Sequence, residues 1–276
     1  MRKREASGGG RKIGLARALS KLGYCSRSQA ATLIRDGRVR LNGRLKNDSE
    51  TPVNLERDRI VVDGRGVEDR EKIYWMMNKP RGLVTTASDE KGRETVYDVL
   101  SRAGEAMPWV APVGRLDKAS EGLLLLTNDS EWGARVAAPA THLEKTYHVQ
   151  IGAMADEAFV QEIVRGVKSN GELLGARDAR VLRTGEKNCW LEIVLDEGKN
   201  RQIRRMMESL GVEVLRLVRV ALGPLQLGKL AKGVYRALTS AEKLALDRAM
   251  AKSGPRTSDL GPQTTALRRR GFDKKT

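Results

Sequence analysis

The chain has 276 residues, 40% of them hydrophobic, which is enough to build a core in one large domain or in two smaller ones. Its 51 Lys and Arg residues outnumber 35 Asp and Glu residues, and the formal charge of +16 favours a polyanionic partner, with nucleic acid first. Two cysteines, two histidines and no long apolar run exclude a disulfide scaffold, a clustered zinc site and a membrane span.

Both ends of the chain are basic and poor in large apolar residues. Residues 1–12 hold five basic residues and one acidic residue, and residues 252–276 hold seven basic and two acidic residues. We therefore expect a disordered basic N-terminal arm and a disordered basic C-terminal tail, which either attract phosphate groups or simply keep the protein soluble. The first residues also lack the apolar core of a secretion signal, so we expect a cytoplasmic protein.

Residues 13–63 predict two short helices followed by a hairpin. In the first helix apolar residues recur at three-residue steps, and Gly23 follows as its end. The second helix starts at the capping box Ser26–Gln29, in which each side chain can satisfy the backbone N–H of the other residue. Asn42-Gly43 suits the type I′ turn of a hairpin because both residues tolerate a positive φ.

This front unit is also basic, which suits a surface that binds RNA. The helix start and the hairpin segment Gly37–Gly43 resemble those of the S4-like RNA-binding domain. That resemblance implies RNA contacts for the arginines of the unit; the alternative is that they only form a solvated face. The arginines expected to bind RNA are Arg17, Arg27, Arg38 and Arg40.

After a linker at 64–72, residues 73–246 predict a second, larger domain in which strands and helices alternate. Strands are expected at 149–151, 190–195 and 212–220, and helices near 131–138, 156–165 and 201–210. This interleaving favours an α+β domain with a long mixed sheet. No GxGxxG segment opens a helix after a strand, so the sequence gives no support for a dinucleotide or adenosyl-methionine cradle.

A run of four leucines, Leu123 to Leu126, predicts a buried strand, and Asp117 lies in the loop that leads into it. A carboxylate at such an edge is partly stripped of water, so it needs a neighbouring cation to stay ionised. Arg115 and Lys118 flank it, but neighbours in an extended loop point in different directions, and neither is an assured partner.

A better partner for this carboxylate lies in the segment Gly198–Met206. Asn200 is a plausible N-cap, and the apolar residues that follow form a helical stripe. At about 100° per residue, Arg204 borders this stripe, whereas Arg201 and Arg205 fall on the far face. We therefore expect a half-buried Arg204 to hold the carboxylate with its planar fork. Taken singly, such an arginine more often reaches solvent.

A third segment of interest, Glu144–Val149, opens a further strand. Alternation along it places Tyr147, Val149 and Ile151 on an apolar face and Thr146, His148 and Gln150 on the opposite face. The Tyr147 ring can close a pocket while its hydroxyl stays near the polar rim; the alternative is an ordinary core tyrosine.

Together these stretches resemble the pseudouridine synthases of the RsuA/RluB-type branch, which act on ribosomal RNA and carry an S4-like domain in front. The similarity covers the chain from Ile13 to about Ala241. Four ordered motifs carry it: Asn78–Gly82, Gly114–Asp117 with Gly122–Asp129, Glu144–Tyr147, and Glu197–Met206.

The resemblance implies a catalytic domain with a long mixed, mainly antiparallel sheet flanked by helices. It assigns Asp117 as the catalytic aspartate, Tyr147 as the tyrosine beside the target base and Arg204 as the arginine paired with the aspartate. Arg115 matches a residue that in relatives enters the space left by a flipped base. Further RNA contacts are expected from Lys79, Arg201 and Arg205.

The implied reaction moves the ribose from a ring nitrogen of uracil to carbon 5, without a redox change, so we expect no cofactor and no metal. The expected partner is ribosomal RNA in an assembling subunit, bound by what we take to be a monomer. Two alternatives stay open. One is a non-catalytic RNA-binding protein that assists ribosome assembly; the other, an rRNA methyltransferase, is disfavoured by the missing glycine-rich loop.

Overall fold

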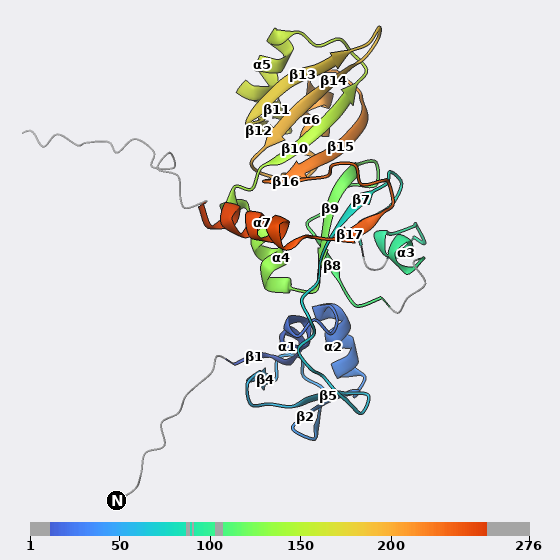
Figure 1. The fold of residues 1–276 in the computed structure, drawn as a ribbon, viewed down its shortest axis with the longest axis vertical. Coiled ribbons are helices and arrows are strands. Elements are labelled where there is room, and N and C mark those ends of the chain that lie inside the picture. Colours follow the sequence, from blue (N-terminus) through green and yellow to red (C-terminus); the bar gives the residue numbers. More distant parts are fainter. Residues whose placement is uncertain (1–11, 87–88, 90, 103–106, 253–276) are drawn as a thin grey trace, which may run out of the picture.

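A computed structural model describes residues 12–86, 89, 91–102 and 107–252 of the chain. A small N-terminal domain lies at one end of an elongated molecule, and a larger domain built on a long sheet forms the rest (Figure 1). Of the predicted basic arm and tail, only Lys12 and Lys252 fall within the described residues. No described helix is long and apolar enough to cross a membrane.

The small domain has the predicted order of two helices followed by strands. Its main sheet has the strand order β3-β2-β5-β6, and β1 pairs with β4 beside it. The elements are β1 (Ile13–Gly14), α1 (Leu15–Lys21), α2 (Arg27–Arg35), β2 (Val39–Leu41), β3 (Arg44–Lys46), β4 (Pro52–Val53), β5 (Ile60–Val62) and β6 (Arg65–Gly66).

The local signals of this domain are confirmed. The Ser26 side chain accepts from the backbone N–H of Gln29 at 3.1 Å, and the Gln29 side chain accepts from the Ser26 backbone N–H at 3.0 Å. Asn42 and Gly43 take φ values of 51° and 79°, as the turn between β2 and β3 requires. Short-range hydrogen bonding therefore determines where these elements begin and turn.

The large domain is built on a nine-stranded sheet with the central order β13-β14-β10-β15-β9-β7-β17. Among its described strands only β15 and β9 pair in parallel, so the mixed, mainly antiparallel sheet expected from the sequence is confirmed. The strands of this sheet are β7 (Tyr74–Lys79), β8 (Ala111–Val113), β9 (Glu121–Thr127), β10 (Lys145–Ile151), β13 (Asp178–Thr184), β14 (Cys189–Leu195), β15 (Val214–Leu222), β16 (Leu225–Gln226) and β17 (Tyr235–Ala237). Strands β11 (Val167–Ser169) and β12 (Glu172–Leu174) form a separate two-stranded hairpin.

Helices cover the sheet in two separate places (Figure 1). At one end, α5 and α6 pack on β10, β14 and β15. At the other end, α4 and α7 pack on one face of β7 and β9, and α3 packs on the opposite face. The helices are α3 (Val96–Ser101), α4 (Ser130–Ala137), the 3₁₀ turn η1 (Pro139–Thr141), α5 (Glu157–Arg165), α6 (Gln202–Ser209) and α7 (Ser240–Lys252).

The last helix extends the large domain past its expected end. We placed that end at residue 246, but α7 continues to Lys252, and both Leu246 and Met250 are buried in the core that α4 shares with β9. Leu246 and Met250 are four residues apart and therefore lie on the same face of the helix. Because both pack into the core, the domain continues to the end of α7.

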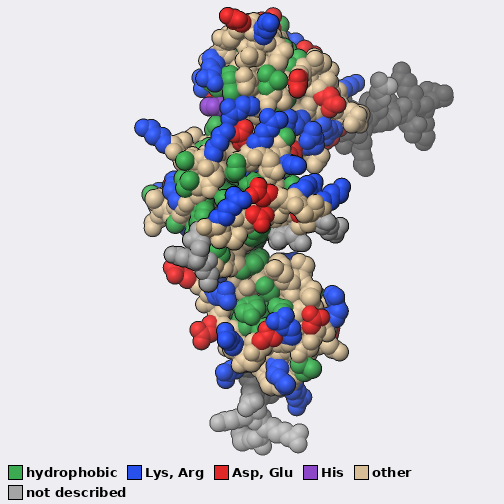
Figure 2. All heavy atoms as spheres, turned by 90° about the vertical axis from the view of Figure 1, so that its right-hand side faces the viewer, with side chains coloured by type: hydrophobic (Ala, Val, Ile, Leu, Met, Phe, Trp, Pro, Cys, Tyr) green, Lys and Arg blue, Asp and Glu red, His purple; other side chains and the backbone are tan. Residues whose placement is uncertain are grey.

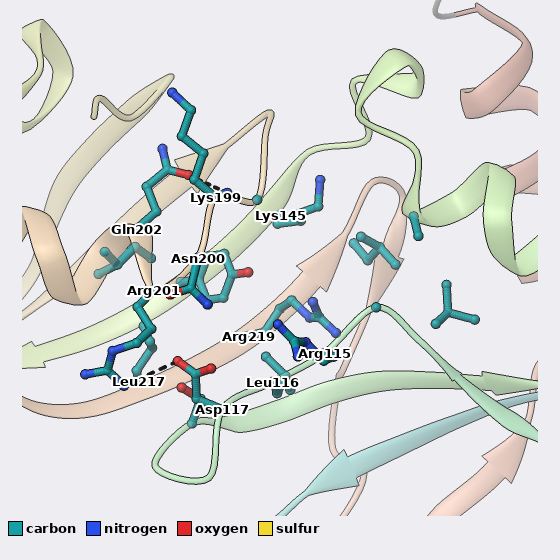
Figure 3. Close-up of a pocket in the computed structure, with 18 of the residues that line it drawn as sticks. Arg115, Leu116, Asp117, Lys145, Lys199, Asn200, Arg201, Gln202, Leu217 and Arg219 are labelled. Carbon is teal, nitrogen blue, oxygen red and sulfur yellow. Dashed lines mark hydrogen bonds and ion pairs between the residues drawn. The ribbon is translucent and has the colours of Figure 1, made fainter. Parts of the chain in front are cut away.

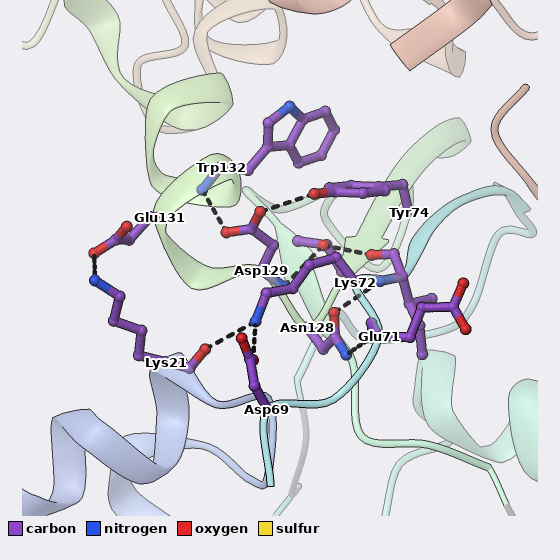
Figure 4. Close-up of polar contacts among 11 residues, drawn as sticks. Lys21, Asp69, Glu71, Lys72, Tyr74, Asn128, Asp129, Glu131 and Trp132 are labelled. Carbon is purple, nitrogen blue, oxygen red and sulfur yellow. Dashed lines mark hydrogen bonds and ion pairs between the residues drawn. The ribbon is translucent and has the colours of Figure 1, made fainter. Parts of the chain in front are cut away.

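A network of polar contacts joins the two domains where the linker enters β7 (Figure 4). The fully buried Asn128 accepts from the backbone N–H of Ile73 at 2.8 Å and donates to the carbonyl of Glu71 at 2.8 Å. At the surface, Lys21 of the small domain pairs with Glu131 of the large domain at 3.0 Å. The buried amide, rather than the surface pair, is expected to fix the joint.

Replacing Asn128 with alanine is expected to lower the free energy of unfolding by about 1–3 kcal/mol, because the backbone groups of Glu71 and Ile73 lose the buried amide that bonds both of them. Glu131→Gln, which breaks the exposed pair, is the control and should cost less than about 1 kcal/mol. Chemical denaturation of both variants measures the difference. An equal loss for the two would mean that the Asn128 amide does not hold the linker.

Candidate active site

Asp117 lines two hollows of the large domain, one of which is drawn in Figure 3. One hollow has a volume of about 330 Å³ and also contains Tyr147. The other, of about 580 Å³, also contains Thr85 and Lys118. The Asp117 side chain is 37% exposed, so its carboxylate is accessible from the cavity. Residues from three of the four sequence motifs line these hollows.

Hydrogen bonds hold the Asp117 loop at five consecutive backbone carbonyls. Four of the donors come from β7, from the residues that follow it up to Thr85, and from α6, and the fifth is the Ser120 backbone N–H of the loop itself. Distant segments thus fix the same loop. Leu116 O accepts from Thr85 Oγ1 at 2.7 Å, Asp117 O from Ser120 N at 2.9 Å, Lys118 O from Gly82 N at 2.7 Å, Ala119 O from Arg204 Nη2 at 2.9 Å, and Ser120 O from Lys79 Nζ at 2.9 Å. Such support preorganises the carboxylate for chemistry.

Gly122, directly after this loop, permits the parallel contact of β9 with β15. Its φ is +102°, and a Cβ at this position would lie 2.2 Å from the carbonyl oxygen of Arg219. No side chain fits in that space, so glycine is required for the two strands to approach. This approach brings the Asp117 loop beside the residues of β15.

Lys79 was expected to contact RNA, and this prediction is wrong. Its side chain is fully buried, and Nζ donates to the carbonyls of Ser120 at 2.9 Å and of Pro80 and Asp117 at 3.2 Å each. Burial lowers the pKa of Lys79 to about 8, and the charges of Asp117 and Glu121 only partly oppose this. Lys79 is a positioning residue that supports the Asp117 loop through its backbone carbonyls from the protein interior.

Replacing Lys79 with methionine is expected to lower kcat for chemistry at the Asp117 carboxylate by roughly 10²-fold, because two carbonyls of the loop lose a donor and a displacement of about 1 Å can cost that much. The KM for RNA should change little, because the buried amine cannot reach a ligand. Steady-state kinetics with the exposed-lysine variant Lys229→Met as control checks this; a change confined to KM would contradict the positioning role.

The cation that pairs with Asp117 is Arg201 and not the expected Arg204. Arg201 Nη1 lies 3.7 Å from Asp117 Oδ2. Arg204 instead donates Nη2 to the carbonyl of Ala119 at 2.9 Å and Nη1 to that of Val214 at 3.4 Å, and its buried Nε has no partner among the described residues. Arg204 therefore supports the aspartate through the backbone of its loop.

The conformation of Arg201 explains this difference. Helix α6 starts at Gln202, so the N-cap is Arg201 and not Asn200, and Arg201 takes a left-handed φ of 48°. A residue outside the helix does not follow the helical spacing that placed Arg201 on the far face.

Burial lowers the pKa of Arg204, as does the nearby charge of Arg201, whereas the charge of Asp117 opposes the shift.

Two family models match the chain. The model for RNA pseudouridylate synthase matches residues 73–209, and the S4 domain model matches residues 13–65. An RNA pseudouridine synthase of Rickettsia bellii, itself uncharacterized, is 35% identical over 225 residues, which cover 82% of this chain and 96% of the relative. The chain belongs to the RNA pseudouridylate synthase family.

Further members of the family support this assignment over most of the chain. The ribosomal large subunit pseudouridine synthase B of Bacillus subtilis is 34% identical over 242 residues, which cover 87% of this chain and 97% of that protein. A crystal structure of a pseudouridylate synthase is 31% identical, covers 85% of this chain and 99% of its own, and superposes with a TM-score of 0.57. The protein is therefore an RNA pseudouridine synthase with an S4 domain.

In this pseudouridine synthase, Tyr147 lies on the expected face of β10. It lines the same hollow as Asp117 and packs against the apolar core beneath α6. In the sheet it pairs with Ile193 of β14 and with Arg219 of β15. The alternation of β10 predicted this face, and the position leaves the ring available to a base in the cavity.

The other residues expected to contact RNA differ in their surroundings. Arg115 is exposed and lines both hollows beside Asp117. Arg205 instead donates to Ser169 O at 3.1 Å and to Glu172 at 2.9 Å, so it ties α6 to the hairpin of β11 and β12. In the S4 domain all four arginines expected to bind RNA are exposed, namely Arg17, Arg27, Arg38 and Arg40, and Arg38 forms a two-point contact with Asp63.

The sequence prediction missed Arg219, which lines the hollow next to Tyr147. The sequence does contain a signal, because Arg219 lies on the face of β15 that is otherwise apolar. The sequence does not give the strand register, which is needed to place Arg219 beside Tyr147. Among the described residues no group of three or more His, Cys, Asp and Glu side chains could hold a metal ion.

Proposed function

We propose that this pseudouridine synthase isomerises one uridine of ribosomal RNA and that Asp117 is its catalytic residue. The observation that carries this is the position of the Asp117 carboxylate: it is accessible, lies on a loop held at five consecutive carbonyls, and shares a cavity with Tyr147. A cavity of about 330 Å³ suits a nucleoside-sized ligand, and a uracil must leave its stack to reach it.

The chemistry requires one bond to break and another to form. The bond from ribose C1′ to uracil N1 breaks, the base turns, and C1′ bonds to C5, which then loses its proton while N1 gains one. Ionised Asp117 starts this sequence either by attacking C1′ or by removing the proton from C2′ to give a glycal. Tyr147 packs on the freed base and holds it for the turn.

Ribosomal RNA is the proposed substrate for two reasons. The Bacillus subtilis relative is named for the large ribosomal subunit, and it matches the chain in both domains. The surface offers cations for an RNA backbone: Figure 2 shows a band of Lys and Arg side chains across the upper part of the molecule, with fewer Asp and Glu among them. We propose a uridine of the large-subunit RNA.

Mapping of pseudouridines in ribosomal RNA from cells with and without the gene tests this proposal. One modified position should disappear on deletion and return when the gene is restored, but not when the Asp117→Asn variant is supplied. An unchanged map in the deletion strain would contradict the proposed substrate. Restored modification with the variant would contradict the role of Asp117.

A further inference from the structure

Arg219 is a buried arginine in the active-site hollow, and the chemistry proposed above does not use it. The residue is 5% exposed, and its Nε donates to the carbonyl of Leu123 at 2.7 Å, which fixes the side chain against β9. Its Nη2 has no hydrogen-bond partner among the described residues. A buried donor that is held in place without an acceptor indicates that the acceptor arrives with a ligand.

The charges around Arg219 indicate what kind of ligand this is. Arg115 and Lys145 line the same hollow, and in Figure 3 Arg115 and Arg219 are drawn on one side of Asp117 with Arg201 on the other. Among the described residues that line the hollow, Asp117 is the one acid, and its ion pair is with Arg201. Arg219, Lys145 and Arg115 thus line the cavity, and none of them forms an ion pair with an acid among the described residues.

Lys145 shows the effect of this imbalance. Its Nζ donates to the carbonyl of Leu143 at 2.9 Å. Burial lowers the pKa of Lys145, and the positive charge of Arg219 lowers it further, against the opposing charges of Asp196 and Glu197. An anion between the two groups would remove this repulsion.

We propose that Arg219, Lys145 and Arg115 form a phosphate subsite that binds a backbone phosphate next to the extruded uridine. A uracil carbonyl could accept from Nη2, but it is neutral and would leave the three positive charges unbalanced. A phosphate offers charge and several acceptors to an arginine fork. Held there, it would orient the attached ribose toward Asp117. The inference rests on the proposed function, since it takes the ligand to be RNA.

Binding of uridine 3′,5′-bisphosphate and of uridine to the full chain tests the subsite. The bisphosphate carries one phosphate on each side of the ribose, as the target does in RNA. The side-chain Nε–Hε signal of Arg219, assigned from its loss in Arg219→Lys, should shift with the bisphosphate and stay in place with an equal concentration of uridine. Equal shifts with the two compounds would mean carbonyl recognition and would overturn the proposal, as would no shift with either.

Variants separate the subsite from general charge effects. Arg219→Lys and Lys145→Gln should each weaken bisphosphate binding about tenfold, whereas the exposed variant Arg183→Gln, from β13, should bind as the unaltered protein does. If Arg219→Lys folds poorly, Lys145→Gln still decides, because unchanged binding in it would contradict the subsite. Binding is read without turnover, so a missing rRNA activity would count against the proposed function and not against this inference.

Discussion

Replacement of Asp117 with asparagine is expected to reduce pseudouridine formation by roughly 10⁴-fold or more, because the amide can neither attack the ribose nor accept its proton. Asparagine has nearly the same size as aspartate, and the five carbonyl hydrogen bonds of the loop do not involve the side chain. The loop should therefore keep its shape. RNA affinity should stay within a few fold of that of the unaltered protein.

Single-turnover assays with a ribosomal RNA fragment measure the rate, and filter binding with the same fragment measures the affinity. Asp178→Asn, which removes one exposed acid from the start of β13, is the matched control and should leave the rate unchanged. Near-normal product formation by the Asp117 variant would remove the carboxylate from the mechanism. A large loss of RNA binding would instead show that the side chain acts in binding.

Much of the fold follows from signals within a few residues of one another. The capping box at Ser26, the Asn42-Gly43 turn and the leucine run each depend on local hydrogen bonding or on the period of apolar residues. Strand β13 was missed because most of its residues are exposed, so apolar alternation along it is weak. The hairpin of β11 and β12 is too short for periodicity to be seen.

The active site was only partly predictable for a different reason. Asp117 and Tyr147 could be proposed as site residues because they lie in motifs, but their partners depend on contacts between distant segments. Arg219 meets Leu123 across 96 positions, through a parallel pairing that no local pattern indicates. Arg201 reaches Asp117 because one residue takes a left-handed conformation before α6. Helical spacing could place Arg204 near the loop, but it could not show which atom it would bind.

The roles of the two arginines can be separated by replacing each with glutamine. Arg204→Gln is expected to lower kcat by roughly 10²-fold, because the Ala119 carbonyl loses its donor and the Asp117 loop can shift by about 1 Å. Arg201→Gln should lower kcat less than about fivefold, since an exposed ion pair contributes at most about 1 kcal/mol. Its main effect should be a higher KM for RNA.

Arg204→Lys distinguishes a positioning role from loss of the fold. The ammonium group offers a donor to the Ala119 carbonyl but lacks the planar fork whose two nitrogens contact Ala119 and Val214 separately, so it should recover part of the lost kcat with a thermal midpoint close to that of Arg204→Gln. Recovery of kcat without recovery of stability would place the effect in the loop. A larger loss of kcat in Arg201→Gln than in Arg204→Gln would contradict this assignment. The direct ion pair of Arg201 with Asp117, at 3.7 Å, would then be the interaction that supports the aspartate.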